Sequence, residues 1–398
     1  MSTSPGRVAE LRARGDSTRA GRYVRQPEGY SAFHPAPYPP GDLRLDGSLL
    51  GLLSTADMEL GRLVGSSEIL PNPDLFVRMY VRREAVLSSQ IEGTQASLMD
   101  VLEYEAVHAR AEHRVDVREV SNYVDALRYG LKRVASLPLS LRLMREIHGK
   151  LMEGVRGGEP TKTPGEFRKS QNWVGGPSPA TARYVPPPVH EMREALGLFE
   201  RSLHERPPYP LLINVGLAHA QFETIHPFLD GNGRMGRLLV TFLLCEYGVL
   251  SEPLLYLSIF FKEHRQEYYD RLQAVRDVGD WEGWLAFFLE GVGTVAREAT
   301  ETARKIVRLR EELREALPSQ LGRRSGNALR LLDKLFRTPV VTVRTVEILL
   351  GISQPAALAL VDAITAAGVL QEATGKRRNR VFRFRRYLAL FGERERRE

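Results

Sequence analysis

Cysteine is nearly absent from the sequence: Cys245 is the only one among 398 residues. A single thiol excludes an internal disulfide framework and a cysteine-based zinc site. Cys245 directly follows the apolar run 238–244, which favours a small buried residue over a reactive nucleophile. Low cysteine usage is typical of a reducing compartment, so we predict a cytoplasmic protein.

Long hydrophobic runs are missing as well. The longest, around 238–245, is far shorter than the roughly 20 apolar residues that cross a bilayer. Arg7, Arg12 and Arg14 are not followed by an apolar segment, so we expect neither a signal peptide nor a membrane partner. Hydrophobic residues still make up 43% of the chain, enough for a buried core, and the length predicts two or three domains.

An excess of acidic residues is also missing, because the net charge is +7. From Arg323 to the end there are sixteen Lys/Arg and seven Asp/Glu, whereas the rest of the chain has 40 Lys/Arg and 42 Asp/Glu. All the excess positive charge therefore lies in the C-terminal segment. This asymmetry predicts a contact with nucleic acid or with an acidic protein there.

Proline content and apolar periodicity divide the chain into regions. Several prolines with scattered glycine argue against a helix near the N-terminus. Apolar residues spaced three or four apart then predict helices over most of the chain, so the predicted fold class is mainly α. The predicted regions are an irregular N-terminal arm at 1–40, an N-terminal helical region at 41–115, an all-helical core at 116–317, a linker at 318–324 and a separate domain at 325–390.

One segment of the core differs from its helical surroundings. Trp173–Val174 and Tyr184–Val185 are short apolar pairs that flank Gly175–Gly176–Pro177. Two such pairs around a glycine-rich turn predict a small exposed β-hairpin at 171–185. An exposed hairpin edge can bind an extended peptide by strand pairing, so this segment is a candidate for holding a partner protein. A hairpin with no binding role is the alternative.

The C-terminal domain has the pattern of a winged helix-turn-helix. Short helices are predicted at 328–336, 343–350 and 354–367, and strands at 369–372 and 381–384. Four basic residues lie between the two strands, where they can reach DNA phosphate: Lys376, Arg377, Arg378 and Arg380. The third helix, however, is mostly Ala, Leu and Val, with little to read base edges. DNA binding, protein docking and homodimer formation therefore stay open as alternatives for this domain.

The densest group of candidate functional residues is the segment 226–237, His-Pro-Phe-Leu-Asp-Gly-Asn-Gly-Arg-Met-Gly-Arg. It joins two predicted helices, so its glycines lie just before a helix N-terminus, where backbone N–H groups and the helix dipole bind anions. Gly231 and Gly233 permit positive φ and a close approach of the ligand. A P-loop is excluded, because no G-x-x-x-x-G-K-[ST] sequence occurs.

Four side chains of this segment supply complementary chemistry. Arg234 and Arg237, three residues apart on one helical face, can clamp two successive phosphates. Asp230 offers an oxygen ligand to a phosphate-bound Mg²⁺. His226 is the one group of the loop expected to change charge near neutral pH, so it can take a proton from an attacking hydroxyl. Each residue alone has an ordinary structural explanation, but together they favour phosphate chemistry.

The segment resembles the Fic signature, H-P-F-x-[DE]-G-N-G-R-x-x-R, at every specified position. The resemblance covers roughly residues 30–290 and includes 75–97, 165–187 and 255–276. It implies an all-helical Fic core that transfers AMP from ATP to a Ser, Thr or Tyr hydroxyl of a target protein and of the chain itself. Attack would fall on the α-phosphorus, and pyrophosphate would leave. Related Doc-type kinases carry Lys where this chain has Gly233, which favours AMP transfer over phosphorylation.

The resemblance also implies a role for each residue of the loop. His226 resembles the catalytic base, Asp230 the Mg²⁺ ligand and Phe228 a buried aromatic that anchors the loop. Tyr268 and Tyr269 lie where relatives line the adenine pocket, and a core position is the alternative for both. Arg234 is expected on the β-phosphate and Arg237 on the γ-phosphate. The full set of expected nucleotide-binding residues in the loop is Gly231, Asn232, Gly233, Arg234, Met235, Gly236 and Arg237.

A second motif precedes the core. Ser88-Ser-Gln-Ile-Glu92-Gly93 fits the family's inhibitory pattern, [S/T]-x-x-x-E-[G/N]. Ser88 and Glu92 are four residues apart, hence on one helical face, and Gly93 is placed to end the helix. A carboxylate delivered to Arg237 would take the cation that the γ-phosphate needs, so we expect intramolecular inhibition. A solvated glutamate near a helix end is the alternative.

The leading interpretation is an autoinhibited protein adenylyltransferase that uses ATP and Mg²⁺ and holds its target at 171–185. Whether the same site also removes AMP is left open. An interpretation from another class is a DNA-binding regulator whose Fic core senses nucleotides. A toxin-like phosphotransferase is disfavoured by Gly233.

Overall fold

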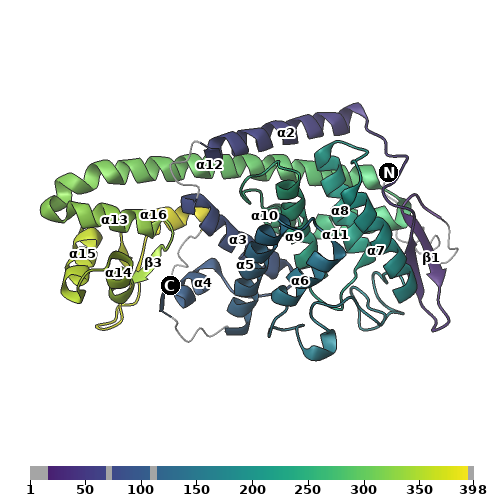
Figure 1. Ribbon diagram of the computed structural model, residues 1–398, viewed down its shortest axis with the longest axis horizontal. Helices are drawn as coiled ribbons and strands as arrows, with labels where there is room; N and C mark the ends of the chain where they lie inside the picture. Colours follow the sequence, from purple (N-terminus) through teal and green to yellow (C-terminus); the bar gives the residue numbers. More distant parts are fainter. Residues whose placement is uncertain (1–16, 69–73, 108–113, 393–398) are drawn as a thin grey trace.

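A computed structural model of the chain describes residues 17–68, 74–107 and 114–392. Two helices, α2 (Gly47–Glu68) and α12 (Trp281–Leu321), lie side by side along one edge of the molecule (Figure 1). α2 places an apolar residue every three or four positions on one face, and that face is buried: Leu49, Leu53, Ala56, Leu60 and Leu63. The 41 residues of α12 reach from the central helices to the C-terminal domain.

The central part of the molecule is built around two helices that are buried on nearly all sides, α8 (Leu211–Ile225) and α9 (Asn232–Glu246). A helix that is apolar all round belongs in a core, which is why these two lie inside the bundle. The helices around them are α3 (Asp74–Ile91), α4 (Leu98–Val107), α5 (Arg114–Val134), α6 (Leu141–Leu151), α7 (Val189–His204), α10 (Ser258–Glu263) and α11 (Arg265–Val278), with a short 3₁₀ turn, η1 (Pro160–Lys162).

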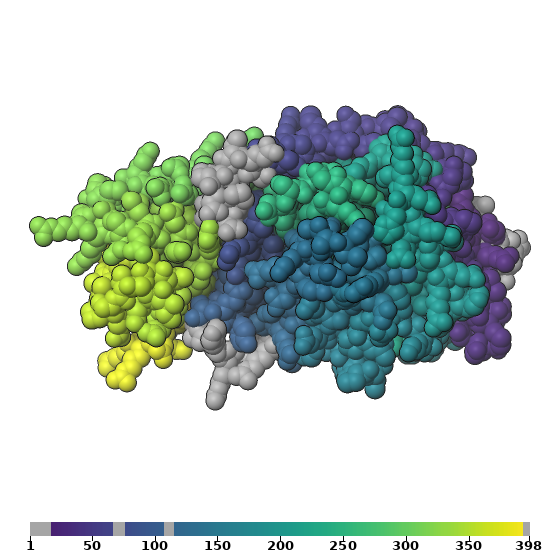
Figure 2. Space-filling view, in the orientation of Figure 1, coloured from purple at the N-terminus to yellow at the C-terminus, as the bar shows by residue number. Residues whose placement is uncertain are grey.

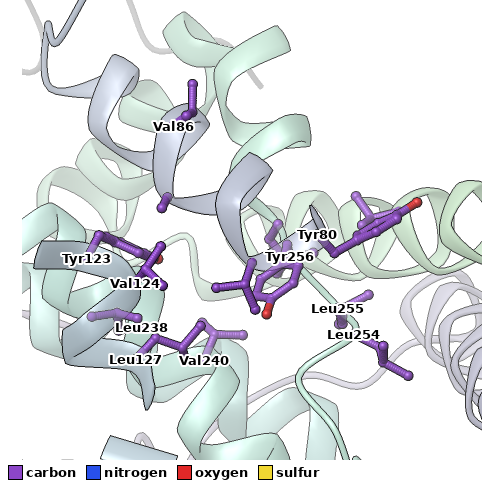
Figure 3. Close-up of a cluster of buried hydrophobic side chains, with 14 of the residues drawn as sticks. Tyr80, Val86, Tyr123, Val124, Leu127, Leu238, Val240, Leu254, Leu255 and Tyr256 are labelled. Atoms are coloured by element: carbon purple, nitrogen blue, oxygen red, sulfur yellow. The ribbon is translucent and has the colours of Figure 1, made fainter. Parts of the chain in front are cut away.

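Buried side chains from α3, α5 and α9 meet the segment 254–256 in one cluster (Figure 3). Figure 3 shows Tyr80 and Val86 of α3 on one side, and Leu238 and Val240 of α9 with Tyr123 of α5 on the other. The cluster fixes α3 against the helix that begins at the signature loop. The position of α3 matters, because Ser88 lies on α3 and Glu92 directly follows it.

The N-terminal arm is not irregular where it is described. β1 (Gly21–Arg25) and β2 (Ser31–Pro35) form an antiparallel pair in which Tyr23 lies opposite Phe33. Both rings are buried and meet edge to face at 5.1 Å. The prolines at 35–40 argue against a helix, and the first of them, Pro35, is the last residue of β2, so they end the hairpin without preventing it. Residues 1–16 lie outside the described part.

The predicted hairpin at 171–185 is reduced to a single bridge. Val174 and Tyr184 exchange backbone hydrogen bonds of 2.9 and 3.1 Å, and neither residue belongs to a longer strand. Tyr184 is buried and donates its hydroxyl hydrogen to the carbonyl of Thr224, so it belongs to the core rather than to an exposed strand. The backbone N–H of Phe33 also donates to the carbonyl of Val185, which joins β2 to the base of this segment.

The C-terminal domain follows α12 almost without a break. The expected linker at 318–324 is helix as far as Leu321, because Leu313 and Leu317 keep the last turns buried around Pro318. The elements are then η2 (Gly322–Arg324), α13 (Ser325–Leu335), β3 (Val340–Thr342), α14 (Val343–Leu350), α15 (Gln354–Ala366), β4 (Gln371–Glu372), β5 (Val381–Arg383), α16 (Arg385–Leu388) and η3 (Ala389–Phe391).

In this domain the three predicted helices are present, and β3 is a strand that the sequence did not predict. β5 lies between β3 and β4 and pairs antiparallel with both. Assignment of the domain to the winged-helix class stays a prediction. Among the described helices none is by itself both long and apolar enough to cross a bilayer, although α14 and α15 reach that length and composition together, with a bend of 112°.

The C-terminal domain packs beside α4, the helix that follows the segment 88–93 (Figure 2). Arg383 of β5 forms an ion pair with Glu103 of α4. The ring of Phe391 meets Tyr80 of α3 edge to face at 5.5 Å. α3 therefore contacts the C-terminal domain near one end and the signature loop near the other.

We expect Trp284→Ala to lower the free energy of unfolding by about 3–5 kcal/mol, because it leaves a cavity in the core. Trp284 is fully buried, and its indole N–H donates to the carbonyl of Gly216 at 2.8 Å. Urea unfolding followed by far-UV circular dichroism measures the change. Leu50→Ala is the control, since Leu50 is 46% exposed. An equally large loss in both variants would contradict this account of the core.

Candidate active site

The signature loop is closed by its own asparagine. α8 ends at His226, which has φ 49°, and α9 begins after Gly231, which has φ 76°. The side chain of Asn232 accepts a hydrogen bond from the N–H of Phe228 at 2.9 Å and donates to the carbonyl of Phe228 at 2.8 Å. Asn232 is 2% exposed, so its side chain is structural and only its backbone is left to bind an anion.

A buried histidine of α6, His148, packs against the signature loop at 226–237. The rings of His148 and Phe228 stack at 3.7 Å, and Phe228 is fully buried, as expected for an anchor. The N–H of Gly165 donates to Nδ1 of His148 at 2.9 Å, so Nε2 carries the proton and donates to the carbonyl of Asp230 at 3.0 Å. Burial lowers the pKa of His148 to about 4, which keeps this ring neutral in its bridging role.

Two further side chains hold the backbone of His226. Arg168 is fully buried and donates from Nε to the His226 carbonyl at 3.1 Å. Asn172 donates from Nδ2 to the same carbonyl at 3.2 Å and to that of Phe228 at 2.8 Å. Both residues come from the segment that leads into the predicted hairpin. The hairpin base and the loop are therefore one hydrogen-bonded unit.

The imidazole of His226 is neutral in this structure. Burial, with the nearby positive charges of Arg276 and Arg168, lowers its pKa to about 3. This differs from the expected pKa near neutrality, because burial lowers the pKa most and the two buried guanidinium groups, which the sequence does not place next to the ring, lower it further. The side chain remains 18% exposed. A neutral, partly exposed imidazole is able to accept a proton.

The guanidinium group of Arg234 is buried and has hydrogen-bond donors that no described residue uses. The residue is 4% exposed, and its Nε and Nη1 have no hydrogen-bond partner among the described residues. It lies in the first turn of α9, whose N-terminus has no side-chain cap. Unpaired N–H groups at a helix N-terminus beside a buried cation fit a phosphate group.

Asp230 fits the place of a Mg²⁺ ligand only as one ligand among others. Its side chain is 45% exposed, and Oδ1 lies 3.7 Å from Nη2 of Arg234. The described residues contain no group of three or more His, Cys, Asp or Glu able to hold a metal by themselves. A single carboxylate is nevertheless what Mg²⁺ uses when substrate phosphates and water supply its other ligands.

Ser88 and Glu92 of the motif at 88–93 both form hydrogen bonds with Arg237. Nη2 of Arg237 donates to Oε1 of Glu92 at 2.7 Å and to the carbonyl of Ser88 at 2.9 Å, and Nε donates to the Ser88 hydroxyl at 2.8 Å. Burial pushes the pKa of the Glu92 carboxyl upward, but the Arg237 guanidinium outweighs this effect and lowers it. Gly93, with φ 101°, lies two residues after the last residue of α3, at the expected helix end.

Gly233 is needed for space rather than for a positive φ. It lies in the first turn of α9, and a Cβ at this position would fall 2.2 Å from Oε1 of Glu92 and 3.0 Å from Nη1 of Arg237. Any larger side chain at position 233 would therefore meet the Glu92 carboxylate. Positive φ is found at Gly231 instead.

Other expected nucleotide contacts point elsewhere. Tyr268 is 1% exposed and shares a hydrogen bond of 2.9 Å with Nε2 of His219, so it is a core residue and does not face an open pocket. Tyr269 is half-buried, with Arg265 5.7 Å above its ring, and stays a candidate. The side chain of Met235 is fully buried, and Gly236 faces Glu223.

Several residues of the site were missed from the sequence: Glu223, His148, Arg168, Asn172 and Arg276. Four of them lie 50 or more residues from the loop or on another element, and no spacing rule connects them to it. Glu223 is only three residues before His226. Its place on the same helix face as the histidine is a signal that could have found it.

Comparison with known proteins finds two family models that match parts of the chain. The family described as "Fic/DOC family N-terminal" matches residues 50–132, and "Fic/DOC family" matches residues 138–244. A relative from Aedes aegypti named protein adenylyltransferase Fic is 33% identical over 154 residues, 38% of this chain and 27% of the relative. One from Drosophila ananassae with the same name is 31% identical over 160 residues. The chain thus spans 27–28% of the length of these curated relatives.

A solved structure agrees in fold. A Fic family protein from Desulfovibrio desulfuricans superposes with a TM-score of 0.57 at 19% sequence identity, over 86% of this chain and 97% of that one. At this identity the likeness concerns the fold alone.

We expect His148→Gln to make the stability of the chain less sensitive to acid. The unfolded chain protonates this histidine near pH 6.5 and the folded chain only near pH 4, so its contribution is present above pH 6.5 and is lost as the pH falls toward 4. Between pH 7.5 and 5 the parent should lose about 2 kcal/mol more unfolding free energy than the variant.

Urea titrations at the two pH values measure this difference. His190→Gln is the matched control, because His190 lies on the surface with its side chain 81% exposed. The control should follow the parent. The same pH dependence in His148→Gln and in the parent would show that His148 is not held neutral by the fold.

Proposed function

We propose that this chain, which carries the Fic/DOC family domain at 138–244 behind that family's N-terminal region at 50–132, transfers AMP from ATP to a hydroxyl of a protein. The observation that carries the proposal is Arg234, a buried cation in the first turn of α9 whose Nε and Nη1 have no hydrogen-bond partner among the described residues. It lies eight residues from a neutral histidine. Together they offer a phosphate site beside a base.

His226 would act as the base of this reaction. Its Nδ1 contacts the carbonyl of Glu223 at 3.3 Å, and this hydrogen bond requires the proton to be on Nδ1. Nε2 is then free to accept the proton of the attacking hydroxyl. The hydroxyl oxygen bonds to the α-phosphorus, and pyrophosphate leaves with the electron pair of the broken P–O bond. The chain itself contributes mainly position and charge.

Arg234 and the first N–H groups of α9 would hold the phosphates, with Gly231 allowing their close approach. Asp230 would hold Mg²⁺, which neutralises phosphate charge when bound. Of Tyr268 and Tyr269, the two residues expected to line the adenine pocket, only Tyr269 is partly exposed. The fit rests on Nε and Nη1 of Arg234, which have no hydrogen-bond partner among the described residues, and on the half-exposed carboxylate of Asp230 beside them.

Autoinhibition by Glu92 is part of the proposal. The Glu92 carboxylate binds the guanidinium that the γ-phosphate would need, and Ser88 binds it twice more. A nucleotide entering with Glu92 in place would meet an occupied Arg237. Its α-phosphorus would then lie off the line of attack, which is sufficient to suppress transfer.

The segment at 171–185 would hold the target chain, and in self-modification it would hold the modified part of this protein. Trp173 is 40% exposed there, an apolar surface next to a backbone edge with only one bridge. Removal of AMP through the same site is compatible with the same groups. The signature loop and the segment share Arg168 and Asn172, so a bound peptide would lie close to His226.

For the C-terminal domain we favour protein docking over DNA reading. The outward face of α15 exposes Leu358 and Asp362, and Asp362 forms an ion pair of 3.1 Å with Arg380. This pair neutralises one of the four basic residues between β4 and β5. An acidic and apolar helix face is poorly suited to DNA, whereas it fits a protein surface, including that of a second copy of the chain.

Loss of the base tests the catalytic assignment. His226→Ala is expected to reduce transfer of label from [α-³²P]ATP to protein by about two to four orders of magnitude, the range for a general base, while ATP binding measured by calorimetry survives. Unchanged transfer in this variant would refute the assignment. Label arriving from the γ-position instead would indicate a kinase, and no label from either position in any variant would favour the nucleotide-sensing regulator.

Removal of the inhibitory carboxylate should have the opposite effect. Glu92→Gly frees Arg237 and is expected to raise α-label transfer, including self-modification, at least tenfold, a difference of about 1.4 kcal/mol in the barrier. The double variant Glu92→Gly with His226→Ala is the control and should be silent. A folded Glu92→Gly protein with no gain in transfer would end the autoinhibition proposal.

A further inference from the structure

Glu223 is a buried carboxyl group for which the fold has no evident use. It lies on α8, is 6% exposed, and its Oε1 has no hydrogen-bond partner among the described residues. Its one ion-pair neighbour within 4.0 Å in the described part is His226, whose Nδ1 lies 3.7 Å from Oε2. A buried carboxyl without partners is costly, so its retention calls for a role outside stability.

The surrounding residues make room for this carboxyl but do not bind it. A Cβ at Gly236 of α9 would lie 2.5 Å from Oε1, so a glycine at this position admits the group. Arg276 donates to the backbone carbonyl of Glu223 at 3.1 Å and to the hydroxyl of Thr224 at 3.3 Å, not to the carboxylate. A structural ion pair with Arg276 is therefore absent.

The charges facing Glu223 come from every element packed on it. Arg237 faces it from α9, Glu92 from the turn after α3, and Arg276 and Tyr268 from α11. His226 faces it from the end of its own helix, and Tyr184 from the segment at 171–185. Burial raises the pKa of Glu223 to about 7, with Glu92 adding to the rise and Arg237 and Arg276 opposing it. The group therefore changes charge in the range where His226 stays neutral.

We propose that Glu223 is a positioning residue for His226: it faces the Nδ1 side of the ring, keeps that side protonated, and balances the positive charge that the ring gains on taking the hydroxyl proton. The proton moves from the hydroxyl to Nε2 and stays on the ring, and nothing is transferred to Glu223. The inference rests on the proposed function and deepens it. A carboxylate that orients a base from the far side of the ring is a known arrangement in catalysis.

The first test is kinetic and uses the Glu92→Gly chain as parent. Glu223→Gln keeps the shape and removes the charge. In the parent, kcat for self-modification should rise with pH as Glu223 ionises, because the carboxylate form supports the ring, and its midpoint should lie below 7, because the Glu92 charge that raises the pKa of Glu223 is gone. In Glu223→Gln, kcat should be lower by about tenfold or more at pH 8 and flat across this range, with the KM for ATP unchanged.

Glu59→Gln is the matched control, since Glu59 is 5% exposed on α2 and binds Arg62 and Arg297 away from the site. It should keep the pH profile of the parent. A Glu223→Gln profile that parallels the parent, or a loss seen only in the KM for ATP, would overturn the proposal.

The second test needs no activity. The side-chain ¹⁵N resonances of His226 in the wild-type chain should show the Nδ1–H tautomer and should shift between pH 6 and 8 as Glu223 titrates. Glu223→Gln should abolish this shift, and Glu59→Gln should leave it in place. A His226 signal indifferent to the substitution would refute the proposal. If the Glu92→Gly chain transfers no AMP, the proposed function fails, and this measurement still decides whether Glu223 governs the ring.

Discussion

The turn between α8 and α9 runs through residues 226–231 without a helix or strand of its own, so its backbone carbonyl groups must find partners elsewhere. Those partners are side chains: Arg168 and Asn172 on His226, Asn232 on Phe228, and His148 on Asp230. Each is buried, and together they satisfy the carbonyl groups of His226, Phe228 and Asp230. The N–H groups of Phe228 and Gly231 are bound within the loop, whereas Nε and Nη1 of Arg234 have no partner among the described residues and are left for a ligand.

This support also explains why the hairpin segment and the loop form one unit. Arg168 and Asn172 precede the bridge at Val174, and Tyr184 closes it by donating to Thr224 on α8. β2 then binds the carbonyl of Val185 from the far side. The segment 171–185 is thus held by hydrogen bonds at both of its ends, while its backbone forms a single bridge between them. An exposed backbone edge of this kind is what peptide binding by strand addition requires.

The sequence predicts the parts of the molecule that depend on local pattern. Helices α2 and α9 follow from the spacing of apolar residues a few positions apart. Gly231 and the pairing of Glu92 with Arg237 follow from the sequence motifs. The pKa of His226 and the position of Tyr268 do not. Both depend on tertiary packing: burial, together with the charges of Arg276 and Arg168, lowers the pKa of His226, and the hydroxyl of Tyr268 shares a hydrogen bond with His219 in the core. The N-terminal hairpin was missed because the prolines from Pro35 onward indicate irregular structure. The contact between Tyr23 and Phe33 joins two strands, and no local pattern in the sequence links them.

Two buried guanidinium groups of the loop are treated differently by the fold. Arg237 makes three hydrogen bonds to Ser88 and Glu92, whereas Nε and Nη1 of Arg234 make none in the described part of the chain. One carboxylate can neutralise one cation, so the site with Glu92 in place still attracts a polyanion through Arg234 and the start of α9. If Glu92 inhibits as proposed, it must therefore act on how the phosphates are aligned and not on whether they bind. A difference in alignment is enough, since a displacement of about 1 Å at the reacting atom is able to cost roughly a hundredfold in rate.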